Sequence, residues 1–175
     1  MQKWELVSSK ELNLGTKYRK IIEDTYRLPD GTVHKFEISK VGNVVDVLAL
    51  DQNNNIILVK QFRPGPKKIF TELVAGLVDK GEKPIDAAKR ELLEETGYTG
   101  DFEFVTKVYI DGYSDVTRHV YIAKNCHKVA EPKLDPSEFL ETVLIPLKEY
   151  RQIIKKGLST NTESAYIALD YLGEL

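Results

Sequence analysis

Short apolar runs separated by polar turns dominate the pattern of the chain. Two of them, at residues 44–50 and 56–62, flank the polar segment 51–55, which predicts a strand, a turn and a second strand. Later runs rich in β-branched residues predict three more strands, at residues 104–110, 119–124 and 141–147. The pattern therefore predicts a sheet of short strands.

The first forty residues show extended patterning around one strong turn. Residues 17–28 and 32–40 have the pattern of strands and are joined by the segment Leu28-Pro29-Asp30-Gly31. Proline presets φ and glycine accepts a positive φ, so this segment suits a tight turn. We expect an N-terminal β-hairpin over residues 1–42, followed by a main domain over residues 43–175.

Three segments carry helical patterns. The strongest is 84–96, with a proline near its first turn and Gly97 just past its end. A second helix is expected over 148–156, stopped by Gly157, and a third over about 163–171, where apolar residues recur at helical spacing. Strands mixed with few helices predict an α/β sandwich, a sheet layer covered by helices.

Composition narrows the class of protein. A chain of 175 residues can bury one full core, and 42% hydrophobic with 30% charged residues is an ordinary globular balance. The net charge of −2 gives no reason to expect a nucleic-acid partner. No apolar run reaches the roughly 18 residues of a membrane span. The start lacks the apolar core of a secretion signal, and Cys126 stands alone, so we expect a cytoplasmic protein.

The helix expected at 84–96 places three carboxylates together. At about 100° per residue, one face holds apolar side chains and a neighbouring arc holds Glu91, Glu94 and Glu95. Like charges at this spacing repel unless a cation lies against them, and Mg²⁺ prefers such oxygen ligands. The alternative is a solvated acidic helix face, which is common on surface helices.

Two neighbours of these carboxylates support the metal-site interpretation. Arg90 stands one turn before Glu94, where it can pair with that carboxylate and orient it. Ala87 falls within the same arc and is small enough to leave space for a ligand. Both features suit a site that binds a cation and a substrate.

The residues around the helix match a known signature at nine positions with set spacing. These are Gly76, five residues, Glu82, seven residues, Arg90, Glu91, an apolar Leu92, Glu94, Glu95, Gly97 and a bulky Tyr98. The chain therefore resembles the Nudix hydrolases. The resemblance implies an α/β/α sandwich with a mixed sheet, and Mg²⁺ as cofactor with Mn²⁺ as a substitute ion.

The resemblance also implies a set of metal ligands. Glu91 and Glu95 correspond to the principal ligands, and Glu94 assists as ligand or orienting group. The segment TELVAG before the signature is similar to that of the ADP-ribose pyrophosphatase branch, where a backbone carbonyl corresponding to Ala75 binds metal. Glu82 is expected to support the loop and the helix start.

Catalysis in this family also draws on a later loop. Arg90, Glu94 and Glu95 are expected to act together with one loop carboxylate that serves as base or extra ligand. Glu138 matches that position best, while Asp135 and Glu141 remain alternatives. The plain interpretation of such a loop carboxylate is a solvent-facing acid.

Substrate contacts are expected from several segments. Gln61-Phe62-Arg63 resembles the branch's substrate-contacting strand, and Arg63 suits a phosphate or ribose. Glu72 is a candidate for ribose hydroxyls or a simple strand-end acid. Glu37 and Lys40 are further candidates from the N-terminal arm, which is similar to the branch's dimerising appendage and predicts a homodimer. Three aromatic residues are candidates for base stacking or for packing: Trp4, Tyr26 and Phe36.

The substrate implied by the resemblance is a nucleoside-diphosphate sugar, with ADP-ribose hydrolysed to AMP and ribose 5-phosphate. The sequence differs from that of the ADP-ribose pyrophosphatase branch at two places expected to shape the substrate site. One is Phe36-Glu37, and the other is residues 110–114, a segment in which the branch usually has a proline-containing turn. GDP-mannose or another sugar nucleotide is therefore an alternative. Two further hypotheses are a non-hydrolysing nucleotide sensor, which would lose metal glutamates, and an enzyme acting on damaged nucleoside triphosphates.

Overall fold

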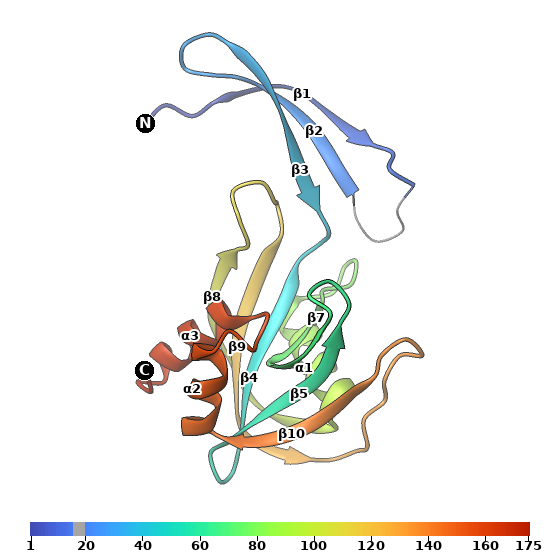
Figure 1. The fold of residues 1–175 in the computed structure, drawn as a ribbon, viewed down its shortest axis with the longest axis vertical. Helices are drawn as coiled ribbons and strands as arrows, with labels where there is room; N and C mark the ends of the chain where they lie inside the picture. Colours follow the sequence, from blue (N-terminus) through green and yellow to red (C-terminus); the bar gives the residue numbers. More distant parts are fainter. Residues whose placement is uncertain (16–19) are drawn as a thin grey trace. The chain divides into compact units, whose positions relative to one another are not determined.

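The computed structural model describes residues 1–15 and 20–175, which divide into two compact units (Figure 1). One unit comprises Met1–Asn43 and Tyr109–Thr117, and the other comprises Val44–Val108 and Arg118–Leu175. Each unit has its own sheet. Within the described residues, no helix is long and apolar enough to cross a membrane.

The first unit contains a three-stranded antiparallel sheet in the order β1-β2-β3. Its strands are β1 (Glu5–Leu12), β2 (Lys20–Arg27) and β3 (Val33–Lys40). The predicted turn is confirmed, with Gly31 at φ 86° and the Leu28 N–H donating to the Thr32 carbonyl at 2.8 Å.

The predicted hairpin is incomplete as a description of this sheet. Strand β1 has no counterpart in the prediction, because its sequence ELVSSKEL lacks regular apolar alternation and nearly all of it is exposed. The part of the predicted strand at residues 17–19 lies outside the described residues.

The second unit contains a seven-stranded mixed sheet in which β10-β5-β4-β9-β8 are neighbours, β6 pairs with β5, and β7 pairs with β4. Strand β4 runs parallel to β9 and antiparallel to β5 and β7. The strands are β4 (Val44–Asp51), β5 (Asn55–Arg63), β6 (Lys68–Glu72), β7 (Val74–Leu77), β8 (Tyr98–Tyr109), β9 (Thr117–Lys128) and β10 (Leu140–Pro146).

Helices cover both faces of this sheet, which confirms the predicted α/β/α sandwich (Figure 1). Alternate residues of β4 enter opposite cores because successive strand side chains point to opposite faces. Val45 and Val47 pack in the core beneath α1, whereas Leu48 and Leu50 pack in the core with α2 and α3.

The helix boundaries follow the predictions within one residue. Helix α1 spans Pro84–Thr96, α2 spans Leu147–Lys155 and α3 spans Thr162–Tyr171. Gly97 ends α1 at φ 77°, with its N–H donating to the Leu93 carbonyl at 2.8 Å. A Cβ there would lie 2.0 Å from the Ala130 carbonyl oxygen, so glycine is required both for the backbone angle and for the close approach of the β9–β10 loop.

Candidate active site

Helix α1 packs against one face of the seven-stranded sheet and carries the three signature carboxylates. Ala88, Leu92 and Thr96 are buried in the core as the helical spacing predicts. Ala87 is also fully buried in this core, so the expectation that it leaves space for a ligand is wrong. Its small size instead allows α1 to approach the sheet closely.

Arg90 is the hub of a charge network on this helix. Its Nε and Nη2 donate to the two oxygens of Glu82 at 3.0 and 3.1 Å, and its Nη1 donates to Glu91 at 2.8 Å and Glu94 at 3.1 Å. Nη2 also donates to the Leu77 carbonyl at 3.0 Å. One guanidinium therefore ties the β7–α1 loop to the acidic stripe, and the predicted pair with Glu94 is present.

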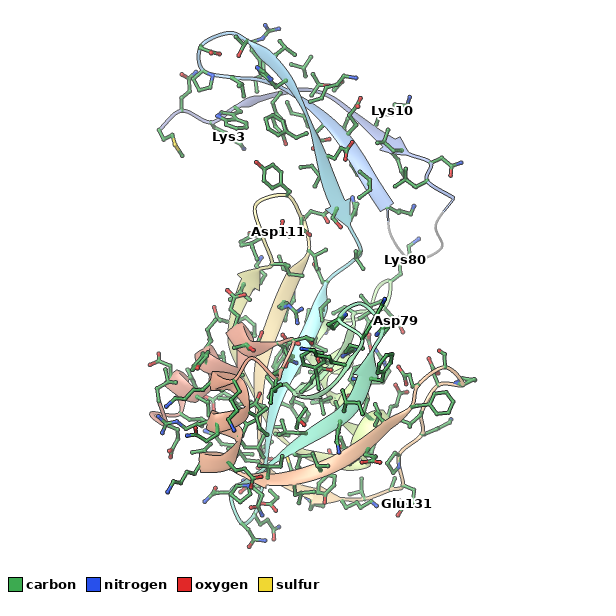
Figure 2. The ribbon with its side chains drawn as sticks, viewed as in Figure 1. Lys3, Lys10, Asp79, Lys80, Asp111 and Glu131 are labelled. Carbon is green, nitrogen blue, oxygen red and sulfur yellow. The ribbon has the colours of Figure 1, made fainter. Side chains whose placement is uncertain are left out.

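The Glu82 side chain stabilises the loop between β7 and α1. Glu82 Oε2 accepts a hydrogen bond from the Asp79 N–H at 3.0 Å, so this acid does support the loop. Figure 2 shows Asp79 and Lys80 at the outer tip of the same loop, where Lys80 is exposed. Hydrogen bonding to Arg90 keeps the pKa of Glu82 below its ordinary value.

Gly76 gives the Glu91 carboxylate its place. A Cβ at residue 76 would lie 1.9 Å from the Cδ atom of Glu91, a separation that no side chain could keep. Glycine is therefore required at position 76, because any side chain there would displace the Glu91 carboxylate. Burial raises the pKa of Glu91, against the opposing effect of Arg90.

Glu95 is the most unusual group of the site. The residue is 5% exposed, and its Oε2 atom is buried without a hydrogen-bond partner among the described residues. Burial, together with the charges of Glu91 and Glu138, raises the pKa of Glu95 to about 8. The Arg63 charge and a backbone hydrogen bond from Ala75 act in the opposite direction and are outweighed.

The loop between β9 and β10 contributes a fourth carboxylate, Glu138, whose charge acts on the carboxylates of α1. Glu138 is exposed, and its charge raises the pKa of both Glu91 and Glu95. Its Oε2 accepts the Asp135 N–H at 3.1 Å, which places it in a local turn. Asp135 and Glu141 are also exposed.

The donor set fits a divalent cation. Glu95 offers an unpartnered buried oxygen, Glu91 stands beside it, and hard cations prefer such oxygens. Within residues 1–15 and 20–175, no three acidic, His or Cys side chains already surround a single point, and Glu91 and Glu94 are both paired with Arg90. Arg90 engages one oxygen of Glu91, Oε1, and leaves the second oxygen of that carboxylate for a cation.

Glu72 is placed differently from these acids. It is fully buried, and its Oε2 accepts a hydrogen bond from Arg63 Nε at 2.7 Å. Its Oε1 accepts hydrogen bonds from the hydroxyl and the N–H of Thr160, in the loop between α2 and α3. Sequence reasoning does not find Thr160, since nothing in the local pattern connects residues separated by 88 positions.

The remaining substrate candidates lie in the first unit. Glu37 is exposed on β3, and Lys40 pairs with Asp115 at 3.6 Å. Trp4, Tyr26 and Phe36 pack against one another with ring centroids 5.4–6.1 Å apart, beside a cavity of about 400 Å³. Packing is thus observed, and a role in base stacking stays a prediction.

Comparison with known proteins agrees with the site. The NUDIX domain matches residues 40–164, which include the whole signature. The chain belongs to the Nudix family. It is a Nudix pyrophosphohydrolase, and Nudix hydrolases generally use divalent metal ions.

Several relatives within this family cover most of the chain. An ADP-ribose pyrophosphatase of Bacillus subtilis is 36% identical over 86% of this chain and 82% of its own length. A methanol dehydrogenase activator of Bacillus methanolicus is 35% identical over 87% and 84%. An ADP-sugar pyrophosphatase of Mus musculus is 35% identical over 81% and 73%.

A solved structure supports the fold of this Nudix protein. The crystal structure of an ADP compounds hydrolase superposes with a TM-score of 0.79 and covers 100% of this chain and 98% of that chain. At 19% sequence identity, the likeness speaks for the architecture alone.

The buried carboxylates predict a pH dependence of stability in the cation-free Nudix protein. The pKa of Glu95 rises from 4.5 to about 8 on folding, so the folded state keeps a proton that the unfolded chain loses. The Glu95 contribution to the free energy of unfolding is full below pH 4.5 and is lost as the pH rises through 8. We expect a loss of about 1–3 kcal/mol. Urea titrations of chelator-treated protein measure it.

Glu95→Gln isolates this contribution, because the amide carries no charge at any pH in the range. The variant is expected to lose less stability than the wild type between pH 5 and 8, on the order of 1–3 kcal/mol less. Glu149→Gln, at an exposed position of α2, is the matched control and should behave like the wild type. An unchanged pH dependence in Glu95→Gln would contradict the assignment.

Proposed function

We propose that the protein hydrolyses the pyrophosphate bond of ADP-ribose with Mg²⁺, yielding AMP and ribose 5-phosphate. The observation that carries the proposal is the buried Glu95 oxygen beside Glu91, which has no hydrogen-bond partner among the described residues. Relatives named for ADP-ribose and ADP-sugar hydrolysis, at 35–36% identity over most of the chain, support the substrate class.

Glu91, Glu95 and the Ala75 carbonyl would hold the metal, with Glu94 assisting. When bound, Mg²⁺ neutralises the charge that develops at the phosphoryl centre and positions the attacking water. The protein's contribution is to keep these oxygens close together and partly dehydrated. Gly76 keeps the space at Glu91 open, and Arg90 orients Glu91 and Glu94.

Glu138 would accept the proton of the attacking water. Its carboxylate is exposed, and its charge acts on Glu91 and Glu95. Its position on a loop suits a base that must approach the attacking water while the helix carboxylates stay fixed. Asp135 and Glu141 remain the alternative bases from the same part of the chain.

Arg63 would bind a substrate phosphate. Its Nε is anchored on Glu72, its side chain is 36% exposed, and its charge acts on Glu95. A guanidinium with a fixed fork suits a phosphate group. Substrate contacts by Glu37 and Lys40 stay predictions from the family resemblance, as does a cytoplasmic location, which the free thiol of Cys126 fits.

The first test is a substrate panel with Mg²⁺: ADP-ribose, GDP-mannose, other nucleoside-diphosphate sugars, dinucleoside polyphosphates and nucleoside triphosphates. We expect the highest kcat/KM with ADP-ribose and AMP among the products. Glu95→Gln should lower kcat at least about 100-fold with the fold retained, while Glu149→Gln should match the wild type.

Each different outcome of the panel contradicts part of the proposal. Preference for another sugar nucleotide would make Phe36 and the 110–114 turn the residues that set specificity. Wild-type turnover by Glu95→Gln at saturating Mg²⁺ would contradict the metal assignment. No turnover of any compound would favour a nucleotide sensor.

We also propose a homodimer through the N-terminal sheet. No described residue of β1, β2 or β3 is fully buried, and apolar Leu6, which shares a face of the sheet with its partner Tyr26, is about half exposed. A three-stranded sheet without a core of its own is stabilised when another surface covers it, and a second copy would do so.

Light scattering at micromolar concentration is expected to give twice the 19.9 kDa chain mass. Leu6→Glu should shift the protein toward monomer, because it places a charge in the covered face. Leu144→Glu, at a similarly exposed position of β10, is the control and should stay dimeric. A monomeric wild type would contradict the proposal.

A further inference from the structure

Glu72 links two distant parts of the second unit through its two carboxylate oxygens. One oxygen accepts Arg63 Nε at 2.7 Å, and the other accepts both the hydroxyl and the N–H of Thr160. The Glu72 side chain is 0% exposed, so water does not compete for either oxygen. Each oxygen is thus oriented by a protein donor.

The loop that carries Thr160 is itself held in register. The Thr71 N–H donates to the Leu158 carbonyl at 3.2 Å, and the Asn161 side-chain amide both accepts from the N–H and donates to the carbonyl of Leu73 at 3.2 Å. Ser159 Oγ donates to Asn161 Oδ1 at 2.8 Å, which fixes the amide. The segment 158–161 therefore lies along residues 71–73 and keeps Thr160 beside Glu72.

Arg63 is oriented by Glu72, the same carboxylate that binds Thr160. Its Nε is engaged by Glu72, while among the described residues its two Nη groups make no hydrogen bond. The Arg63 charge lowers the pKa of Glu95, so the guanidinium acts on the acidic site. A guanidinium held by Nε keeps its fork free for a phosphate.

We propose that Thr160 is a positioning residue for the reaction, acting through Glu72 to orient the Arg63 guanidinium toward the substrate phosphate. The inference rests on the proposed function of Arg63. Without the Thr160 hydroxyl, the buried Glu72 carboxylate loses a charge-assisted donor and can rotate, and Arg63 rotates with it. The contact is therefore more than an anchor for the loop.

The expected kinetic signature follows from where Arg63 acts. An arginine that binds the substrate equally in the ground and transition states affects KM and leaves kcat unchanged. Thr160→Val should raise KM for ADP-ribose about 5-fold, with kcat within about 2-fold of the wild type. Thr160→Ser keeps the hydroxyl and should restore the wild-type KM.

A double-mutant cycle separates positioning from a general structural role. Arg63→Lys is used because it keeps a positive charge beside buried Glu72, whereas Arg63→Ala would leave that carboxylate unpaired. The lysine lacks the two Nη groups of the guanidinium fork. If Thr160 acts through the fork, Thr160→Val should change KM less than about 2-fold in the Arg63→Lys background. Equal effects of Thr160→Val in both backgrounds would overturn the proposal.

Ser164→Ala is the matched structural control. Ser164 lies in α3, shortly after Thr160 in the chain, is fully buried, and donates to buried Asp46 at 2.5 Å, so its loss also removes a bond to a buried carboxylate. Its KM should equal that of the wild type. A rise in KM as large as that of Thr160→Val would overturn the proposal, because any weakening of this region would then have the same effect.

A spectroscopic measurement keeps the test independent of turnover. The Arg63 Nε–H resonance of the wild type should exchange slowly with solvent, because it is bonded to a buried carboxylate, and it should exchange at least about 5-fold faster in Thr160→Val. Unchanged exchange would overturn the positioning role. A wild type that fails to hydrolyse ADP-ribose but shows this exchange difference would contradict the proposed function and leave the Thr160–Glu72–Arg63 connection established.

Discussion

The burial of Glu95 beside a second carboxylate is the constraint on which the site depends. A buried charge without a partner is unfavourable. In the cation-free state, burial therefore raises the pKa of Glu95 and favours the protonated acid. No described Lys or Arg side chain contacts the unpartnered oxygen, although the Arg63 charge acts on Glu95 and Arg90 holds neighbouring Glu91. The arrangement thus favours a cation from outside the chain.

Arg90 and the signature glycines make this arrangement compatible with a stable fold. Arg90 shares its guanidinium among Glu82, Glu91 and Glu94, so the repulsion along α1 is offset on the exposed side and not on the buried side. Gly76 and Gly97 admit groups that a Cβ would displace. The requirement for these residue types in this chain is therefore steric and electrostatic at once.

Helical periodicity and turn chemistry predict α1 and its carboxylate stripe well, because both are local properties of the chain. Ala87 shows the limit of a helical wheel, since the angle alone does not reveal how closely the sheet approaches. Strand β1 escapes prediction because an exposed polar strand has no apolar alternation. The Glu72–Thr160 connection could not be predicted, because it depends on the folded path of residues far apart in sequence.

The central claim, that Glu91 and Glu95 form a divalent-cation site, is tested most directly by calorimetric titration of the chelator-treated protein with Mg²⁺ in the absence of substrate. The wild type and Glu149→Gln should bind with equal affinity, and Glu95→Gln should bind at least about tenfold more weakly. Equal affinity in the wild type and Glu95→Gln would contradict the account, because the buried carboxylate would then have no part in holding the ion.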